Sequence, residues 1–184
     1  HGKTTTTSML SHILLKGECD PTISVGGILP AIGGNIRVGQ SETFLTEACE
    51  YTNSFLSFFP TLGIILNMDA DHLDFFKDID DIRHSFRKFA ELLPADGALI
   101  INADTPKYEM VAENLPCKVI TYGLEHDAEY TASDITYDEF GHPTFHVLHN
   151  GEDIGTCSLK VPGIHNVSNA LASIAAGRLL GLDN

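Results

Sequence analysis

The stretch His1-Gly2-Lys3-Thr4-Thr5 matches the second half of the phosphate-binding loop G-x-x-x-x-G-K-[ST]. In such loops, backbone N–H groups hold the phosphates, the lysine reaches the terminal phosphates and the hydroxyl binds Mg²⁺. Apolar side chains then recur at helical spacing, which predicts that Gly2 and Lys3 lie at a helix N-terminus. A capped surface helix without a ligand is the alternative. The placement of the motif favours a nucleotide site built from Gly2, Lys3, Thr4 and Thr5, with the first glycine of the loop before residue 1.

A second candidate is Glu47, which lies near the end of the predicted strand Thr43 to Ala48 and is followed by Glu50. In an open parallel sheet, ligands collect outside the carboxyl ends of the strands. Mg²⁺ prefers oxygen ligands, so a carboxylate there would complement the hydroxyl of Thr4. A solvated carboxylate at a strand end is the plainer interpretation, and the spacing by itself favours it.

The segment Asn67 to Asp74 follows the apolar run Leu62 to Leu66 and contains three aspartates and His72. So many polar groups at a strand's carboxyl end could position a metal ion or a reacting phosphate. Histidines in polar loops are often only solvated, and the spacing alone leaves the role of His72 open.

The segment Gly163 to Asn169 precedes the last predicted helix and contains His165, Asn166 and Asn169. An asparagine at such a position is ordinarily a helix cap. Because an amide offers both a donor and an acceptor, these side chains could equally bind the edge of an adenine ring.

Helical and strand-like patterns alternate through much of the chain, which indicates parallel pairing and an α/β fold. We predict helices over Thr4 to Lys16, around Ile79 to Leu93, from Thr105-Pro106 and from about Asn166 to Leu180. Asp78 or Asp80 would cap the second helix. The predicted strands are Thr22 to Val25, Thr43 to Ala48, Leu62 to Asn67, Ala98 to Asn102 and Lys118 to Tyr122. The expected architecture is a P-loop-containing, mostly parallel sheet flanked by helices.

A small antiparallel sheet is expected beside the parallel one. Three further strand-like runs, separated by turn signals, cover Tyr130 to Tyr137, Thr144 to His149 and Asp153 to Val161. Asn150-Gly151 is a strong signal for a hairpin turn between the last two.

Composition narrows the classes of function. The chain has 184 residues, 43% of them hydrophobic and 20% charged, which suits one globular domain. Its net charge of -14 would repel nucleic acid, and its apolar runs are too short to cross a bilayer. The four cysteines form no C-x-x-C pair, which favours reduced thiols over a zinc site. We therefore expect a cytoplasmic protein with neither a nucleic-acid partner nor membrane insertion.

Four segments together resemble the Mur ligase family: residues 1–6, Glu47 to Tyr51, Asn67 to Asp74 and Gly163 to Asn169. They occur in the order and spacing of that family, and the match covers the whole chain. The resemblance implies that residues 1–184 are the central, ATP-binding domain of a three-domain enzyme, cut within the P-loop. A UDP-binding N-terminal domain and a C-terminal domain would be absent, and the isolated chain would be inactive.

The resemblance also implies the chemistry. An enzyme of this family uses ATP and Mg²⁺ to convert a carboxylate into an acyl phosphate, which an amine then attacks. Lys3 would neutralise phosphate charge, Thr4 and Glu47 would bind one Mg²⁺, and His72 would bind a second near the acyl phosphate. Lys3, Glu47 and His72 would thus be the catalytic residues. His165, Asn166 and Asn169 would lie at the adenine, and the Gly26-Gly27 and Gly33-Gly34 turns along the muramyl part of the substrate.

Within the family, the segment Glu47 to Tyr51 and the following Ser54 to Leu56 look most like the branch that adds L-alanine to UDP-N-acetylmuramate. Several relatives that add later residues have a carbamylated lysine past the His72 position, where this chain reads Phe86-Arg87-Lys88. The difference fits the alanine-adding branch but does not indicate which group supports the second metal. Many members also have an acid where Cys49 stands.

Three other functions remain open at this stage. A ligase that re-attaches recovered murein peptide to the same UDP-sugar shares most of these motifs. A regulatory P-loop module that binds or hydrolyses ATP would have no use for His72. A folate polyglutamylating ligase would be expected to lack the Glu47 to Tyr51 pattern.

Overall fold

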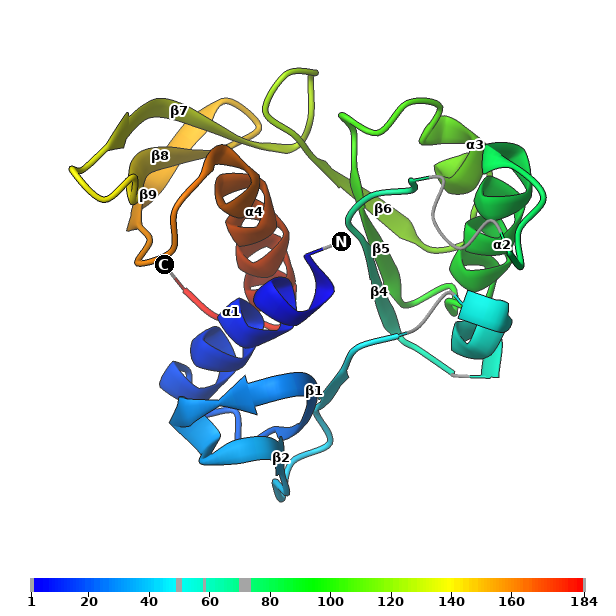
Figure 1. Ribbon diagram of the computed structural model, residues 1–184, viewed down its shortest axis with the longest axis horizontal. Coiled ribbons are helices and arrows are strands. Elements are labelled where there is room, and N and C mark those ends of the chain that lie inside the picture. The colour runs from blue at the N-terminus through cyan, green and yellow to red at the C-terminus, as the bar shows by residue number, and fades with distance from the viewer. Residues whose placement is uncertain (1, 49–50, 58, 70–73, 184) are drawn as a thin grey trace.

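The computed structural model describes residues 2–183 except 49–50, 58 and 70–73. Figure 1 shows the arrangement of its helices and strands. The helices are α1 (Lys3–Lys16), α2 (Ile79–Glu91), α3 (Glu109–Ala112) and α4 (Ile164–Leu179), with 3₁₀ turns η1 (Pro30–Ile32) and η2 (Tyr51–Ser57). The strands are β1 (Thr22–Leu29), β2 (Gly34–Arg37), β3 (Phe44–Thr46), β4 (Leu62–Ile65), β5 (Ala98–Asn102), β6 (Lys118–Tyr122), β7 (Tyr130–Tyr137), β8 (Pro143–His149) and β9 (Glu152–Ser158).

The larger sheet has six strands in the order β4-β5-β6-β7-β8-β9. Strands β4, β5 and β6 pair in parallel, with Ile64 opposite Ile100 and Ile100 opposite Ile120. Helices cover both faces of this part, as expected for strands that read as nearly continuous apolar runs. The predicted mostly parallel α/β sheet is therefore confirmed.

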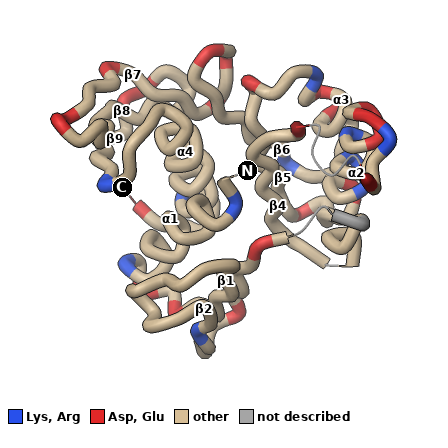
Figure 2. Tube along the Cα trace, viewed as in Figure 1, with Lys and Arg blue, Asp and Glu red and all other residues tan. Residues whose placement is uncertain are grey.

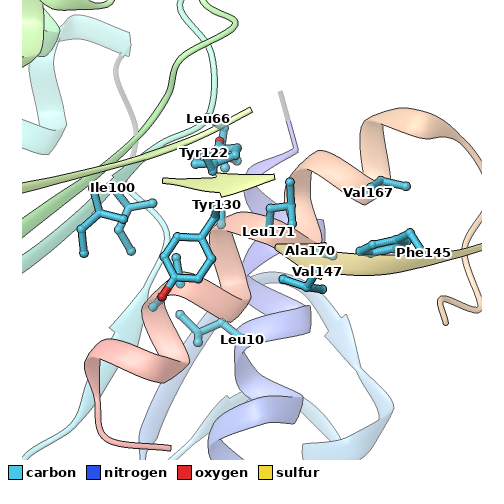
Figure 3. Packing of buried hydrophobic residues seen from close by; sticks show 14 of the residues in the cluster. Leu10, Leu66, Ile100, Tyr122, Tyr130, Phe145, Val147, Val167, Ala170 and Leu171 are labelled. Atoms are coloured by element: carbon cyan, nitrogen blue, oxygen red, sulfur yellow. The ribbon is translucent and has the colours of Figure 1, made fainter. Parts of the chain in front are cut away.

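The side chains of β5 point alternately to two cores. Ile100 packs against α1 and α4, in the cluster that contains Leu10 and Leu171. Leu99 and Ile101 lie on the other face, against α2 and α3. Figure 3 shows the first cluster, in which Tyr130, Phe145 and Val147 continue the contact from the parallel strands onto the antiparallel ones.

The antiparallel strands β7, β8 and β9 extend the same sheet from β6 onwards. Their single parallel link is the pair Tyr122 and Tyr130. Asn150 and Gly151 form the β8–β9 turn, with φ angles of 52° and 83°. These positive values are what a two-residue hairpin turn of the Asn-Gly type requires. The predicted appended antiparallel sheet is confirmed, and it is continuous with the parallel part.

The N-terminal strands form a separate sheet of order β2-β1-β3, in which β1 and β3 are parallel. The sequence pattern had placed the runs at Thr22 and Thr43 in one sheet with the later strands, and this expectation is wrong for the described residues. Strands β3 and β4 belong to different sheets and do not pair with each other, and a groove lies between them. Gly26 and Gly27, expected in a turn, lie within β1.

Two helix starts also differ from the sequence patterns. Helix α3 begins at Glu109 instead of Thr105, because Lys107 adopts a φ of 59° and the intervening residues form a turn. Helix α4 begins at Ile164, after Gly163 with a φ of 97°. For α2, Asp78 is the cap, and its side chain accepts a hydrogen bond from the N–H of Asp81 at 2.9 Å.

The surface charge is mainly acidic, in keeping with the net charge of -14. Figure 2 shows acidic residues along the loops at the ends of β7, β8 and β9 and around α2 and α3. Within the described part of the chain, every helix is too short or too polar to cross a membrane.

We predict that Leu171→Ala lowers the free energy of unfolding by about 2–5 kcal/mol, because it leaves a cavity in the core between α4 and the sheet. Leu171 is fully buried, whereas Met110 on α3 is 48% exposed. Met110→Ala is therefore the control and should change stability by less than about 0.5 kcal/mol. Urea unfolding of the two variants measures the difference, and equal losses would contradict the described core.

Candidate functional site

The N-terminus of α1 has the geometry of an anion site. Gly2 adopts a φ of 82°, and its carbonyl accepts the first helical hydrogen bond, from the N–H of Thr6 at 2.9 Å. The N–H groups of Lys3, Thr4 and Thr5 belong to the first turn, where amides have no intrahelical acceptor. The first turn contains no acidic side chain that would compete for these donors. Phosphate is the kind of ligand that such a helix start binds.

Glu47 and Thr4 converge on the same glycine of β1. A Cβ atom built on Gly26 would lie 2.4 Å from Oε2 of Glu47 and 3.5 Å from Oγ1 of Thr4. The other carboxylate oxygen, Oε1, is buried and has no hydrogen-bond partner in the described structure. A buried carboxylate oxygen without a donor costs free energy unless a cation or a water satisfies it. The pair therefore fits a cation held between a hydroxyl and a carboxylate.

This oxygen set suits Mg²⁺ bound together with nucleotide. Mg²⁺ is usually held by one or two protein groups, and phosphate oxygens and waters complete its shell. Among the described residues, His, Cys, Asp and Glu form no cluster of three or more that could hold a metal by themselves. Thr4 and Glu47 therefore suit a site that they would share with phosphate oxygens and waters.

Helix α1 lies beside α4 (Figure 1), and its start contacts the second and third turns of α4. A Cβ atom on Gly2 would come within 2.9 Å of Oδ1 of Asn169. The hydroxyl of Ser173 also donates to the carbonyl oxygen of Thr6 at 3.2 Å. These contacts bring two of the sequence motifs together although they are far apart in the chain.

The three candidate adenine-binding residues differ in exposure. Asn166 and Asn169 are 7% and 8% exposed, and the Nδ2 of Asn169 donates to the Oδ1 of Asn166 at 3.2 Å. Asn166 itself donates to the carbonyl oxygen of Pro162 at 2.8 Å. The amides therefore bind each other and the backbone of Pro162, but neither caps α4, whose N-cap is Gly163 without a side-chain cap hydrogen bond, so the helix-cap interpretation is wrong for these two residues. His165 is exposed and open to a ligand.

The carboxyl end of β4 reaches the same region. Asn67 and Asp69 line a groove of about 580 Å³ together with Lys3 and Glu47. The rest of this groove is mainly apolar and runs between β3 and β4. His72, Asp71, Cys49 and Glu50 lie outside the described residues.

The sequence patterns missed one polar feature at the ends of β4, β5 and β6. The side chain of Asn102 donates from Nδ2 to the carbonyl oxygen of Leu66 at 3.1 Å. Its Oδ1 accepts from the N–H of Asp104 at 2.9 Å. An Asn-x-Asp sequence at the end of a buried strand was the available signal. Such residues favour turns in which side chains bind nearby backbone.

Asp104 continues this polar chain to the turn after β6. Its carboxylate accepts from the N–H groups of Leu124 at 2.7 Å and of His126 at 2.9 Å, and it pairs with Nδ1 of His126 at 2.9 Å. Burial alone would raise the pKa of Asp104, but these donors outweigh it and lower the pKa. Because the pKa is lower in the folded state, the ionised carboxylate stabilises the fold at pH values above the ordinary pKa of an aspartate. This contribution is lost as the pH falls through the pKa of Asp104 in the folded state.

Comparison with known proteins gives consistent matches. Residues 1–177 match the model of the Mur ligase middle domain. The chain is 62% identical over its whole length to a UDP-N-acetylmuramate–L-alanine ligase of Lachnospira eligens, and it spans 40% of that relative. It thus covers about two fifths of the length of the curated relatives it matches.

Two solved structures share the fold. One is the UDP-N-acetylmuramate:L-alanyl-gamma-D-glutamyl-meso-diaminopimelate ligase from Neisseria meningitides, with a TM-score of 0.87, 29% identity and coverage of this whole chain and 60% of that one. The other is the UDP-N-acetylmuramate-alanine ligase from Thermotoga maritima, with a TM-score of 0.83, 31% identity and coverage of 100% and 40%.

We predict that Gly26→Ala weakens cation binding without unfolding the chain, because the new methyl group displaces the flexible carboxylate of Glu47. In the complete protein, the affinity for Mn²⁺ with a non-hydrolysable ATP analogue should fall about tenfold or more. The control is Gly27→Ala, whose Cβ would meet only Cγ2 of Thr4 at an ordinary 3.5 Å. Paramagnetic Mn²⁺ titration measures both variants. Equal affinities would contradict the convergence of Glu47 on Gly26.

Proposed function

The chain belongs to the Mur ligase family, and on that premise we propose that it is the ATP-binding central part of an enzyme that joins L-alanine to UDP-N-acetylmuramate. The observation that supports the proposal is that Thr4, in the first turn of α1, and Glu47, one of whose carboxylate oxygens is buried without a partner among the described residues, lie beside the same glycine, Gly26. The 62% identity to an alanine-adding ligase supports the choice of substrate.

The proposed reaction has two steps, formation of an acyl phosphate and formation of the amide. A carboxylate oxygen of the muramyl group attacks the γ-phosphorus of ATP, ADP leaves and an acyl phosphate forms. The amine of L-alanine then attacks the acyl carbon, phosphate leaves and the amide remains after loss of a proton. The first step brings two anions together, so its main barrier is electrostatic.

The residues at the site address that barrier. The amides at the start of α1 would hold the phosphates, and Lys3 would neutralise charge on the β- and γ-phosphate oxygens. Thr4 and Glu47 would hold Mg²⁺, which supplies charge stabilisation at the transferring phosphoryl group. His72 is proposed as a ligand of a second Mg²⁺ from its sequence motif alone. His165 would contact the adenine, with Asn166 and Asn169 holding α4 in place beneath it.

The groove beside α1 supports the proposal that further chain precedes residue 1. In the described residues, β3 pairs only with β1 and β4 only with β5, so both have an edge on this groove. The P-loop motif consists of a strand, the glycine-rich loop and a helix. We infer that a preceding strand fills the groove, joins the two sheets and leads into Gly2. The UDP-binding and C-terminal parts would account for more of the length that the relatives have.

The main alternative within the family is a ligase for recovered murein peptide. The higher TM-score of the Neisseria meningitides enzyme, 0.87 against 0.83, favours it. Sequence identity favours alanine more strongly, because 62% to an alanine-adding ligase far exceeds 29% to the peptide ligase. A non-ligase ATPase module is the alternative from another class, and it predicts ATP hydrolysis that does not depend on an amine.

Composition supports the remaining parts of the proposal. A chain with net charge -14 is a poor partner for nucleic acid. Cys19, Cys117 and Cys157 are free thiols among the described residues, which suits a reducing compartment such as the cytoplasm, where ATP is available.

We predict that Lys3→Ala or Glu47→Ala in the complete protein lowers the rate of ligation at least 100-fold, since each removes charge stabilisation at the transferring phosphoryl group. Circular dichroism should show an unchanged fold. The matched controls are Lys107→Ala and Glu109→Ala, which remove the same charges from the α3 region, and they should keep near-normal rates. Near-normal turnover in either test variant would remove that residue from the site.

The amine preference tests the assignment of substrate. With UDP-N-acetylmuramate, ATP and Mg²⁺, the complete protein should release phosphate when L-alanine is supplied and hardly at all with a murein tripeptide. A pocket shaped for a small amine excludes the larger one by its size. Preference for the tripeptide would transfer the assignment to the peptide ligase. Amine-independent release at full rate would favour the ATPase module.

A further inference from the structure

The segment that follows β4, Leu66 to Asp69, lies beyond the last backbone pair between β4 and β5. In the described structure β4 is an edge strand, and its last register partners are Ile65 and Ile101. Beyond that pair the chain runs through Leu66 to Asn67 and Asp69, which line the groove together with Lys3 and Glu47. Whatever holds Leu66 therefore sets where this segment enters the site.

The side chain of Asn102 provides that support. Its Nδ2 donates to the carbonyl oxygen of Leu66 at 3.1 Å, one position beyond the last pair of the β4–β5 ladder. Its Oδ1 accepts from the N–H of Asp104 at 2.9 Å. Because one partner is an acceptor and the other a donor, the amide can satisfy both in one orientation only. A carboxylate of the same shape could satisfy only the second.

Asn102 is linked through Asp104 to the turn that follows β6. The carboxylate of Asp104 accepts N–H groups from Leu124, Glu125 and His126 at 2.7 to 3.1 Å. Gly123 lies so close that a Cβ atom there would be 2.9 Å from Oδ1 of Asp104. The ends of β4, β5 and β6 are thus joined by one continuous chain of hydrogen bonds, and Asn102 is the link to β4.

We propose that Asn102 is a positioning residue, which holds the segment Leu66 to Asp69 in register with the phosphate and cation site. It does not touch the reacting atoms, and it acts through the backbone of Leu66. The part of this inference that concerns activity rests on the proposed ligase function. The part that concerns the position of the segment does not.

A purely structural role would make different predictions. Loss of a hydrogen bond that served only stability would lower the melting temperature and leave the cation requirement of the remaining folded enzyme unchanged. A positioning role changes the site in the folded enzyme. The half-saturating Mg²⁺ concentration and the local protection of the Leu66 to Asp69 amides separate the two.

The first experiment uses hydrogen exchange of the complete, metal-free protein, read by mass spectrometry. Asn102→Asp keeps the acceptor for Asp104 but places a carboxylate oxygen against the carbonyl of Leu66. Exchange of peptides covering Leu66 to Asp69 should become about tenfold faster, the loss expected when a donor is replaced by a repelling acceptor. Asn102→Ala, which adds no charge, should give a smaller increase at the same peptides and serves if the first variant does not fold.

The matched control is Asp153→Ala, on β9 at the edge of the six-stranded sheet opposite β4. Asp153 accepts from the N–H group of Gly155 at 2.9 Å, so it also binds backbone through its side chain. Its substitution should speed exchange near Gly155 and leave Leu66 to Asp69 unchanged. Unchanged protection of Leu66 to Asp69 in both Asn102 variants would overturn the proposal.

The second experiment measures Mg²⁺ dependence of phosphate release by the same variants. Asn102→Asp should raise the half-saturating Mg²⁺ concentration about tenfold, whereas Asp153→Ala should not change it. A lower melting temperature with the wild-type Mg²⁺ dependence would reduce Asn102 to a structural role and overturn the proposal. Absence of amine-dependent release by the unmodified enzyme would refute the ligase function instead, and the exchange result would still decide the position of the segment.

Discussion

The parallel pairing of β4, β5 and β6 is the constraint on which the site depends, because parallel strands deliver all their carboxyl ends to one edge of the sheet. The chain must then cross back outside the sheet after each strand, and α2 and the α3 segment do so on one face. Polar residues at and just after the strand ends are therefore brought together on this side of the sheet. Asn67, Asn102 and Asp104 occupy these positions. Polar groups that lie far apart in the sequence therefore become neighbours in the fold, because the strands that carry them are neighbours.

The other side of the site depends on the packing of α1 against α4. Both helices begin with a glycine that has a positive φ, Gly2 at 82° and Gly163 at 97°. The contact between Gly2 and Asn169 and the hydrogen bond from Ser173 to Thr6 keep these two helix starts at a fixed separation. Their N-termini carry partial positive charge, which an acidic chain needs if it is to bind a nucleotide. Local backbone dipoles can thus attract the phosphates of a nucleotide, although the net charge of -14 repels them.

Much of this was predictable from the sequence, and what was not has physical causes. Strands β5 and β6 were predicted with their observed bounds, since both runs are rich in apolar or β-branched residues and each is followed by a turn. The division into two sheets was not predicted, because β1 and β3 have the same local pattern whether or not a strand lies between β3 and β4. The start of α3 was misplaced because the turn at Lys107 uses a φ of 59°, which no proline or glycine signals. The pairing of Thr4 with Glu47 was proposed from motif resemblance, whereas Asn102 was not singled out, since a single asparagine at a strand end is common.

The space that the carboxylate of Glu47 occupies beside β1 exists because residue 26 is a glycine. Gly26 does not need a positive φ, so its backbone conformation is open to any residue, and only the neighbouring Glu47 explains why a larger one would not fit. A methyl group at this position would occupy the place of a carboxylate oxygen at 2.4 Å. The carboxylate would then have to turn away and would leave its place near Thr4. The glycine and the unsatisfied oxygen are therefore two parts of one arrangement: the strand leaves room for the carboxylate of Glu47, and one oxygen of that carboxylate is buried without a hydrogen-bond partner among the described residues. A cation bound there with phosphate would remove that cost, and this couples the binding of metal to the binding of nucleotide.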